Sequence, residues 1–376
     1  MASVTKRAHN SGSIRKNGTG WQLRYRKNGK VIYEQVRGTR KDADKVLRER
    51  LGKIESGNHV NKRKVTVGAY LAEWLPDFAE SKPLKPRTAQ DYKQKINCYT
   101  GPIADIPLQK LENSSLKSLY NGMKTKQLGN STIDGLHRVL NVAFNYAVQE
   151  GYLSVNPQKG MPRRKVTPKT VEVWDTETRA RFLDIATGHQ YGNFYWLAYL
   201  TGMRRSEISG LRWKNVDLEN GRIKVYEILH RISGMGLVLG TPKTDRSRRI
   251  IEIGEDTVQL LHDIKFQQVF QKTELNDAWT QTDHVMTQPD GMPIDPDLVT
   301  KAFTKLIRNG GFSHLTVHGL RHTFASMALE AGWEAKDLCE HLGHTSIKTT
   351  YDIYAHIMPK RKKENAKKVE AALLGK

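Results

Sequence analysis

The spacing of apolar side chains changes along this chain, and the changes divide it into parts of different secondary structure. Three short segments between residues 13 and 36 are predicted to be strands, because glycine-containing turn signals such as Asn28-Gly29 separate them. From residue 66 to about 157, apolar side chains recur every three or four positions, which indicates helices. At 376 residues, the chain also exceeds what one hydrophobic core usually supports. We therefore expect a multidomain fold that is mainly α with small β elements.

A three-stranded sheet with one helix is predicted in residues 1–62. Thr39 is placed to cap a helix whose apolar side chains share one face and would cover the sheet. Alternation along residues 21–26 puts Arg24 and Arg26 on one face of their strand. The sheet face away from the helix is then free to enter a DNA groove. An ordinary solvated basic sheet is the alternative interpretation.

The charge of the chain favours a polyanionic partner. It contains 61 Lys and Arg residues against 39 Asp and Glu residues, which gives a net charge of +22. Residues 1–60 are the most basic part, with 15 Lys and Arg against 5 Asp and Glu. Nucleic acid is the partner that such a distribution most often serves. A basic composition that only aids solubility is the competing explanation.

A four-helix domain is predicted in residues 63–157, followed by a basic linker in residues 158–171. The linker carries Arg163, Arg164 and Lys165 and contains no acidic residue. Its prolines suit an extended segment that lies along DNA phosphates. A second boundary between domains is therefore expected here.

The remaining residues, 172–376, are predicted to be mostly helical with one strand-rich insert. The segments 222–228, 236–239 and 248–253 are rich in β-branched residues or alternate, and residues 240–247 would form the turn before the last of them. They are expected to form a three-stranded meander.

Side chains suited to phosphodiester chemistry are concentrated in four short segments of this last part: residues 201–207, 241–246, 318–322 and 342–354. Phosphoryl transfer from a diester builds negative charge on the non-bridging oxygens, while one bridging oxygen leaves as an alkoxide. Two arginines and an acid meet those needs. Arg204 and Glu207 stand three residues apart, as do His318 and Arg321, so on helices each pair would project toward one site.

In order and spacing, these segments resemble those of the tyrosine recombinases, the family of phage integrases, Cre and the Xer proteins. The resemblance covers the whole chain. It implies an arm-type DNA-binding domain in residues 1–62, a helical core-type DNA-binding domain in residues 63–157 and a mixed α/β catalytic domain in residues 172–376.

The resemblance also implies a role for each site residue. Arg204 and Arg321 would clamp the scissile phosphate, and Glu207 matches an acidic position that orients the arginine. Lys243 would protonate the leaving 5′ oxygen. The remaining roles fall to His318 and His344, as proton handlers or hydrogen-bond donors, and to Tyr354, as the nucleophile that forms a 3′-phosphotyrosyl link. The link conserves bond energy, so no cofactor and no metal is expected.

Two tyrosines, Tyr351 and Tyr354, lie three residues apart, so both could face one side of a helix. Tyr354 is favoured, because in the family's pattern a histidine or a similar polar residue follows soon after the nucleophile, as His356 does here. Tyr351 is then expected to be an aromatic packing residue.

Other classes of protein compete with this interpretation. His318 and His322 are four residues apart, as zinc ligands on a helix would be, but Gly319 stands where a hydrolase would carry glutamate. Activity that survives EDTA would exclude a zinc hydrolase. A non-catalytic DNA-binding regulator would explain the charge only, and a type IB topoisomerase would share the chemistry without assembling on two DNA sites.

The function predicted is a site-specific recombinase, most like the integrase of a phage or mobile element. Its expected partners are double-stranded attachment-site DNA and three further copies of the chain, with a DNA-bending factor and an excisionase as candidate accessory proteins. The longest apolar run, residues 194–200, is too short to cross a bilayer, so no membrane is expected. Two cysteines and no secretory signal favour the cytoplasm. The apolar C-terminal end is expected to be a helix that docks on a neighbouring protomer or on its own domain.

Overall fold

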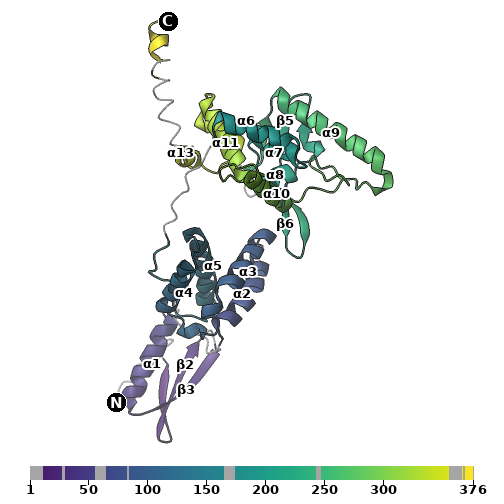
Figure 1. Ribbon diagram of the computed structural model, residues 1–376. Coiled ribbons are helices and arrows are strands. Elements are labelled where there is room, and N and C mark those ends of the chain that lie inside the picture. The colour runs from purple at the N-terminus through teal and green to yellow at the C-terminus, as the bar shows by residue number, and fades with distance from the viewer. Residues whose placement is uncertain are drawn as a thin grey trace. The chain divides into compact units, whose positions relative to one another are not determined.

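The computed structural model describes residues 12–27, 30–55, 65–82, 84–164, 174–242, 247–354, 366 and 369–375. The chain divides into two compact units, Met1–Thr167 and Pro168–Lys376 (Figure 1). The boundary between them falls inside the basic segment 158–171. Within the described part of the chain, no helix is long and apolar enough to cross a membrane.

The N-terminal sheet contains three antiparallel strands in the order β1-β2-β3, and one helix follows it: β1 (Ser13–Asn17), β2 (Gly20–Lys27), β3 (Lys30–Arg37) and α1 (Arg40–Glu55). Thr39 caps α1 as predicted, because its Oγ1 accepts a hydrogen bond from the Asp42 backbone N–H at 3.3 Å. The Asp42 carboxylate returns the contact by accepting from the Thr39 N–H at 2.8 Å. The predicted sheet-plus-helix is confirmed.

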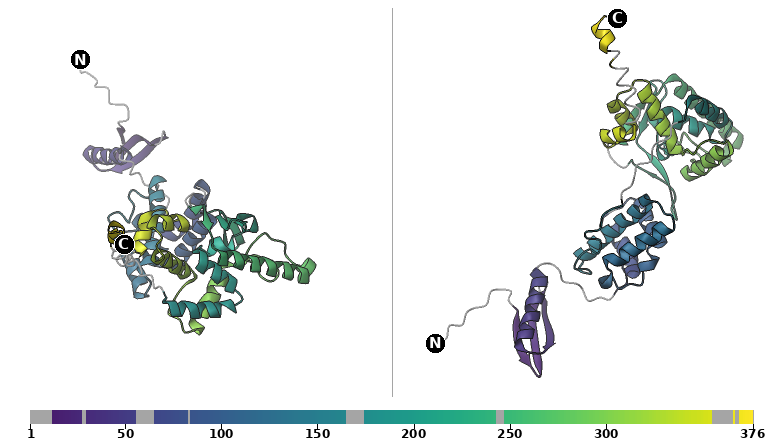
Figure 2. Two further views of the ribbon diagram at one scale, coloured as in Figure 1. Left: turned by 90° about the horizontal axis from the view of Figure 1, so that it is seen from above. Right: turned by 60° about the vertical axis from the view of Figure 1, so that its left-hand side comes forward.

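One face of this sheet is covered by α1, as the two views of Figure 2 show. Leu23 and Tyr25 on β2 are buried with Ala43 and Leu47 of α1 in a small core. Side chains alternate along a strand, so Arg24 lies on the opposite face, where it is exposed.

The rest of the first unit is a bundle of four helices, which confirms the helical domain: α2 (Val67–Ser81), α3 (Pro86–Tyr99), α4 (Asn113–Thr125) and α5 (Asn130–Gln149), with short 3₁₀ turns at Gly101–Ile103 and Leu108–Lys110. Thr66 caps α2 through its side chain, as its position before an apolar run predicts. Helix α3 begins at Pro86, whose ring presets the backbone angle of the first helical residue. Trp74 and Phe144 are fully buried in the core of this bundle.

The described part of the second unit contains eight named helices and five short strands, and residues 369–373 near the C-terminus are also helical. The helices are α6 (Thr176–Thr187), α7 (Gly192–Thr201), α8 (Arg205–Ser209), α9 (Glu255–Leu275), α10 (Pro296–Asn309), α11 (Val317–Glu330), α12 (Ala335–Leu342) and α13 (Ile347–Tyr354), with 3₁₀ turns at Trp213–Asn215 and Asn276–Ala278. The strands are β4 (Val216–Asp217), β5 (Arg222–Val225), β6 (Ile228–Ile232), β7 (Gly236–Gly240) and β8 (Arg249–Glu252). Phe182, Tyr195 and Phe303 form the aromatic centre of its core.

The predicted three-stranded meander is wrong in its pairing. The segment 222–228 divides into two strands: β5 pairs with β4 and β8, whereas β6 pairs with β7 in a separate hairpin. The break falls beside Glu227, whose carboxylate accepts hydrogen bonds from Arg212 Nε at 2.7 Å and Asn215 Nδ2 at 2.9 Å. These contacts hold the chain outside the β5 ladder.

Candidate active site

Arg204 lies at the sharp turn between α7 and α8. Gly202 ends α7 in the left-handed conformation, with φ 62°, and Arg204 is the N-cap of α8. Its backbone N–H donates to Glu207 Oε2 at 2.8 Å, and its Nη1 donates to Glu207 Oε1 at 2.6 Å. The carboxylate thus fixes both the backbone and the guanidinium of Arg204, while the arginine side chain remains 31% exposed.

Arg321 is buried beside the same turn. Thr316 caps α11, and Arg321 follows one turn into the helix with a side chain that is 2% exposed. Its Nη1 donates to the Gly202 carbonyl at 2.8 Å and its Nη2 donates to the Leu342 carbonyl at 2.5 Å. Arg321 therefore joins the end of α7 to the end of α12.

His344 follows the end of α12, where Gly343 adopts φ 65°. The Nδ1 atom of His344 shares a hydrogen bond of 2.8 Å with Thr350 Oγ1 on α13, and Thr350 is fully buried. This contact orients the imidazole. The rings of His318 and His322, both on α11, pack edge to face with centroids 4.8 Å apart.

The two predicted catalytic histidines are poor bases in this state. His318 is exposed on α11, and desolvation by the surrounding protein, together with neighbouring His322 and Arg321, lowers its pKa from the ordinary value. Burial also lowers the pKa of His344 to about 3, with further contributions from Arg321 and Arg204. Both rings are therefore neutral at pH 7, which suits hydrogen-bond donation rather than storage of a proton.

One pocket of about 400 Å³ brings Arg204 and His344 together, whereas Arg321 and His318 are not among its lining residues. Its lining includes Arg204, Glu207, Pro242, Ser247, Gly343 and His344. Pro242 and Ser247 flank the segment that contains Lys243, and Lys243 itself lies outside the described residues. Tyr354 is the last residue of α13, and its side chain also lies outside the description, whereas the Tyr351 side chain is 47% exposed.

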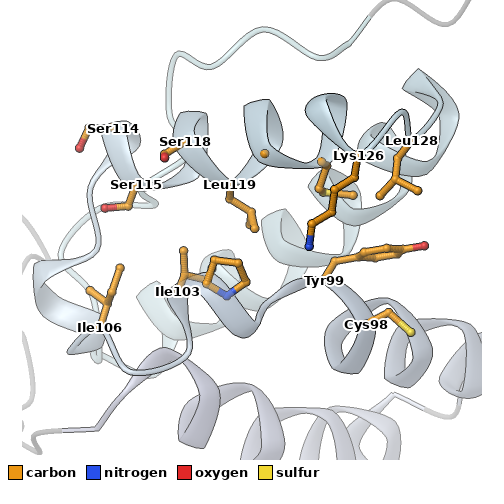
Figure 3. A pocket seen from close by; sticks show the side chains of 13 residues that line it. Cys98, Tyr99, Ile103, Ile106, Ser114, Ser115, Ser118, Leu119, Lys126 and Leu128 are labelled. Carbon is orange, nitrogen blue, oxygen red and sulfur yellow. The ribbon is translucent and has the colours of Figure 1, made fainter.

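A wider pocket, of about 810 Å³, lies in the four-helix domain (Figure 3). Apolar and hydroxyl side chains surround it, and Lys126 is the cation in its lining. It contains no arginine among the described residues, whereas Arg204 and Glu207 line the smaller pocket, so we assign the chemistry to the smaller pocket.

Arg249 on β8 binds Glu207 and was not among the site residues predicted from the sequence. It donates from Nη1 to Glu207 Oε1 at 3.1 Å and from Nη2 to Glu207 Oε2 at 2.9 Å. The signal was present in the strand pattern: Ile251 is an inward apolar residue, so Arg249, two positions earlier, faces inward as well. An inward arginine needs a buried anion, and Glu207 is that anion.

Glu207 is 2% exposed and remains ionised. Burial alone would raise its pKa, but Arg249, Arg204 and Arg321 outweigh burial and lower the pKa from its ordinary value of 4.5 to about 2. In the unfolded chain, Glu207 takes up a proton as the pH falls through 4.5, whereas in the folded protein it takes up this proton only near pH 2. Its contribution to stability is therefore present above pH 4.5 and lost toward pH 2.

We predict that Glu207→Gln lowers the free energy of unfolding by about 3 to 5 kcal/mol at neutral pH, because it leaves buried guanidinium charge without its anion. Urea unfolding at a series of pH values should show the gap between wild type and variant closing as the pH falls below 4.5. A gap that stays constant down to pH 2 would contradict the lowered pKa of Glu207.

The residues predicted to contact DNA in the first unit have mixed surroundings. Arg24 is exposed on the open sheet face, while the Arg26 side chain and Lys165 lie outside the described residues. Arg163 binds the Asp134 carboxylate on α5 through Nε at 3.0 Å and Nη2 at 2.8 Å, although its side chain is 64% exposed. Arg164 Nη2 donates to Asn121 Oδ1 at 3.3 Å. The start of the basic segment is thus held against the helical domain.

Comparison with known families gives two matches. Residues 181–361 match the phage integrase family, and residues 70–166 match the phage integrase SAM-like domain. The first match contains all six residues predicted to be catalytic.

Comparison with individual proteins agrees with the family matches. The chain is 29% identical to a tyrosine recombinase XerC-like protein of Caldanaerobacter subterraneus subsp. tengcongensis, over 89% of this chain and 90% of the relative. It is 27% identical to the ICEBs1 integrase of Bacillus subtilis, over 77% of this chain and 79% of the relative.

Two solved structures show the same fold. The Tn1549 transposon integrase, in complex with transposon right end DNA, is 22% identical with a TM-score of 0.67, and the match covers 82% of this chain and 100% of that one. A lambda integrase tetramer bound to a Holliday junction is 18% identical with a TM-score of 0.58, covering 90% and 94% of the two chains. With both family models, the relatives and the arginine-lined pocket in agreement, the chain belongs to the tyrosine recombinase family.

Proposed function

We propose that this chain is an integrase that cleaves and rejoins attachment-site DNA to insert and excise a phage or mobile element. The observation that carries the proposal is the pocket in which Arg204, Glu207 and His344 meet, with Arg321 directly behind it. Two guanidinium groups beside neutral imidazoles suit a phosphodiester whose non-bridging oxygens gain charge during transfer.

In the proposed reaction, Tyr354 loses its phenolic proton to water, its phenolic oxygen attacks the scissile phosphorus, and the bond to the 5′ oxygen breaks. The 3′ side of the strand stays linked to the tyrosine as a phosphodiester, so no external energy source is needed. Lys243 donates a proton to the leaving 5′ oxygen. Attack by the 5′ hydroxyl of a second strand reverses these steps, returns the proton and frees Tyr354.

The structure supports the roles proposed for the arginines and the histidines as follows. Arg204 is partly exposed in the pocket, where it can reach a phosphate, and Glu207 orients it. Arg321 is buried and donates to two backbone carbonyls, so its guanidinium charge is held at a fixed position behind the pocket. The neutral rings of His318 and His344 can donate hydrogen bonds to the phosphate oxygens.

The remaining parts of the chain are assigned to DNA and to assembly. Residues 1–62 form the arm-type domain, residues 63–157 the core-type domain, residues 158–171 the linker and residues 172–376 the catalytic domain. Four protomers act on two duplexes in the cytoplasm, and a DNA-bending factor or an excisionase joins them when direction must be set. The basic residues Arg24, Arg26, Arg163, Arg164 and Lys165 contact phosphates.

Recombination between two separate DNA molecules tests the proposal. The substrates are two plasmids that carry the joined ends of the element in which the gene resides and its uninterrupted target. Wild type should produce recombinant junctions in the presence of EDTA. Relaxation of supercoiled plasmid without junctions would instead identify a topoisomerase, and binding without strand breakage a regulator.

Removal of residues 1–63 tests the arm-domain assignment. The small core around Leu23 and Leu47 is separate from the core of the helical bundle, so the shortened protein should fold and cleave a core-site suicide substrate. Roughly 0.9 counterions are released for each phosphate neutralised, so the salt dependence of binding to full-length attachment DNA should become shallower. Recombination between full sites should fail.

A short core-site duplex serves as the control in that experiment, and its salt dependence should not change on truncation. Equal salt slopes for the intact and shortened proteins on full-length DNA would show that residues 1–63 make no phosphate contacts. The segment would then be a solubility element rather than a DNA reader.

A further inference from the structure

Three arginines converge on the C-terminal end of α12. Each one donates to a different backbone carbonyl oxygen of three successive residues: Arg249 Nε to His341, Arg321 Nη2 to Leu342 at 2.5 Å, and Arg204 Nη2 to Gly343 at 3.1 Å. The last carbonyls of a helix have no partners within the helix and carry the negative end of its dipole. The end of α12 therefore serves as a common anchor that sets the spacing of the three guanidinium groups.

Arg249 differs from Arg204 in its access to the pocket. Its side chain is 6% exposed, against 31% for Arg204, and the pocket lining contains Arg204 without Arg249. Arg249 also donates to the Ser247 carbonyl at 3.3 Å. Its Nε and both Nη atoms donate to protein groups, and Arg249 does not line the pocket.

Glu207 connects Arg249 to Arg204. Arg249 binds both carboxylate oxygens as a two-pronged fork, which fixes the plane of the carboxylate. Each of those oxygens also accepts from Arg204, one from its Nη1 and the other from its backbone N–H. If Arg249 were absent, the buried carboxylate would be free to rotate toward Arg204 and draw its guanidinium away from the pocket.

We propose that Arg249 is a positioning residue for strand cleavage: by binding Glu207 and the His341 carbonyl, it holds Arg204 at the spacing from Arg321 that the scissile phosphate requires. This inference rests on the proposed function. Arg249 itself touches no reacting atom, so its effect passes through Glu207 and Arg204.

The test uses the full chain and a nicked core-site suicide substrate. Arg249→Met retains the length of the side chain without its charge, and cleavage should slow by about 100-fold, the scale of a misplaced catalytic group. Arg249→Lys keeps the charge but cannot bind both carboxylate oxygens at once, so its cleavage rate should lie between those of wild type and Arg249→Met. Arg222→Met is the matched control, because Arg222 pairs with Glu252 on the same small sheet and is 50% exposed.

A methylphosphonate at the scissile position separates positioning from a general loss of stability. This substrate lacks the charge on one non-bridging oxygen, so it depends less on correctly placed guanidinium groups. Arg249→Met should therefore lose much less than 100-fold on the methylphosphonate, as should Arg204→Ala, while Arg222→Met should match wild type on both substrates.

The outcomes distinguish failure of this inference from failure of the proposed function on which it rests. Equal losses on both substrates for Arg249→Met would overturn the positioning role and leave Arg249 as a stabilising residue, and so would an Arg249→Met rate equal to that of wild type. Failure of wild type to cleave the phosphodiester would instead contradict the proposed function. Thermal unfolding of Arg249→Lys shows whether that variant keeps its fold, so a slow Arg249→Lys enzyme with an unchanged melting temperature would support positioning.

Discussion

Replacing Tyr354 with phenylalanine is expected to abolish strand cleavage while leaving affinity for core-site DNA nearly unchanged. Only the phenolic oxygen is lost, and that oxygen is the proposed nucleophile. Tyr354 ends α13, which begins three residues after His344, so the same short stretch of chain carries the nucleophile and a group of the pocket. Denaturing gels of a nicked suicide substrate would show a covalent protein–DNA adduct for wild type and none for the variant.

Tyr351→Phe is the matched control for that experiment. Tyr351 lies one turn earlier on the same helix, and its side chain is 47% exposed. The variant should form the adduct at the wild-type rate. An adduct that persists in Tyr354→Phe and disappears in Tyr351→Phe would transfer the role of nucleophile to Tyr351.

The second large effect is expected at Lys243, the proposed general acid. Lys243→Ala should slow cleavage of ordinary DNA by about 10²- to 10⁴-fold, the usual range for loss of a positioned proton donor. A 5′-bridging phosphorothiolate has a leaving group that needs no proton. Cleavage of that substrate by Lys243→Ala should therefore approach the wild-type rate, which single-turnover kinetics would measure.

Arg321→Ala is the comparison variant for the Lys243→Ala experiment. Arg321 is proposed to hold the non-bridging oxygens, whose charge the thiolate does not change, so Arg321→Ala should remain slow on both substrates. Equal failure of Lys243→Ala and Arg321→Ala on the thiolate would reject the division of roles. Rescue of both would show that neither acts on the non-bridging oxygens.

Local sequence signals predicted the elements of this fold well. Thr39 and Thr66 cap helices where their positions before apolar runs indicate, and the turn at Gly18 separates β1 from β2. Such signals depend on neighbours a few residues away. The pairing of β5 with β8 does not, because it joins segments separated by the β6–β7 hairpin, and the meander expected from chain order was wrong there.

The sequence predicted only part of the site. The motif order identified Arg204, Glu207 and Arg321, and the structure brings these residues together around one turn. Arg249 escaped notice, because a buried arginine is recognisable only when its anion is known to be buried beside it. Contacts such as His344 with Thr350 depend on how α13 packs after the turn at Gly343, which residue spacing alone does not specify.

The chemical identity of the trapped adduct tests the central claim most directly. Wild-type protein would be reacted with a nicked core-site substrate, digested with a protease and a nuclease, and analysed by fragmentation mass spectrometry. The account predicts a peptide in which Tyr354 carries the 3′ nucleotide of the cleaved strand through a phosphodiester. A nucleotide on any other residue, or cleaved DNA with no attached peptide, would contradict it.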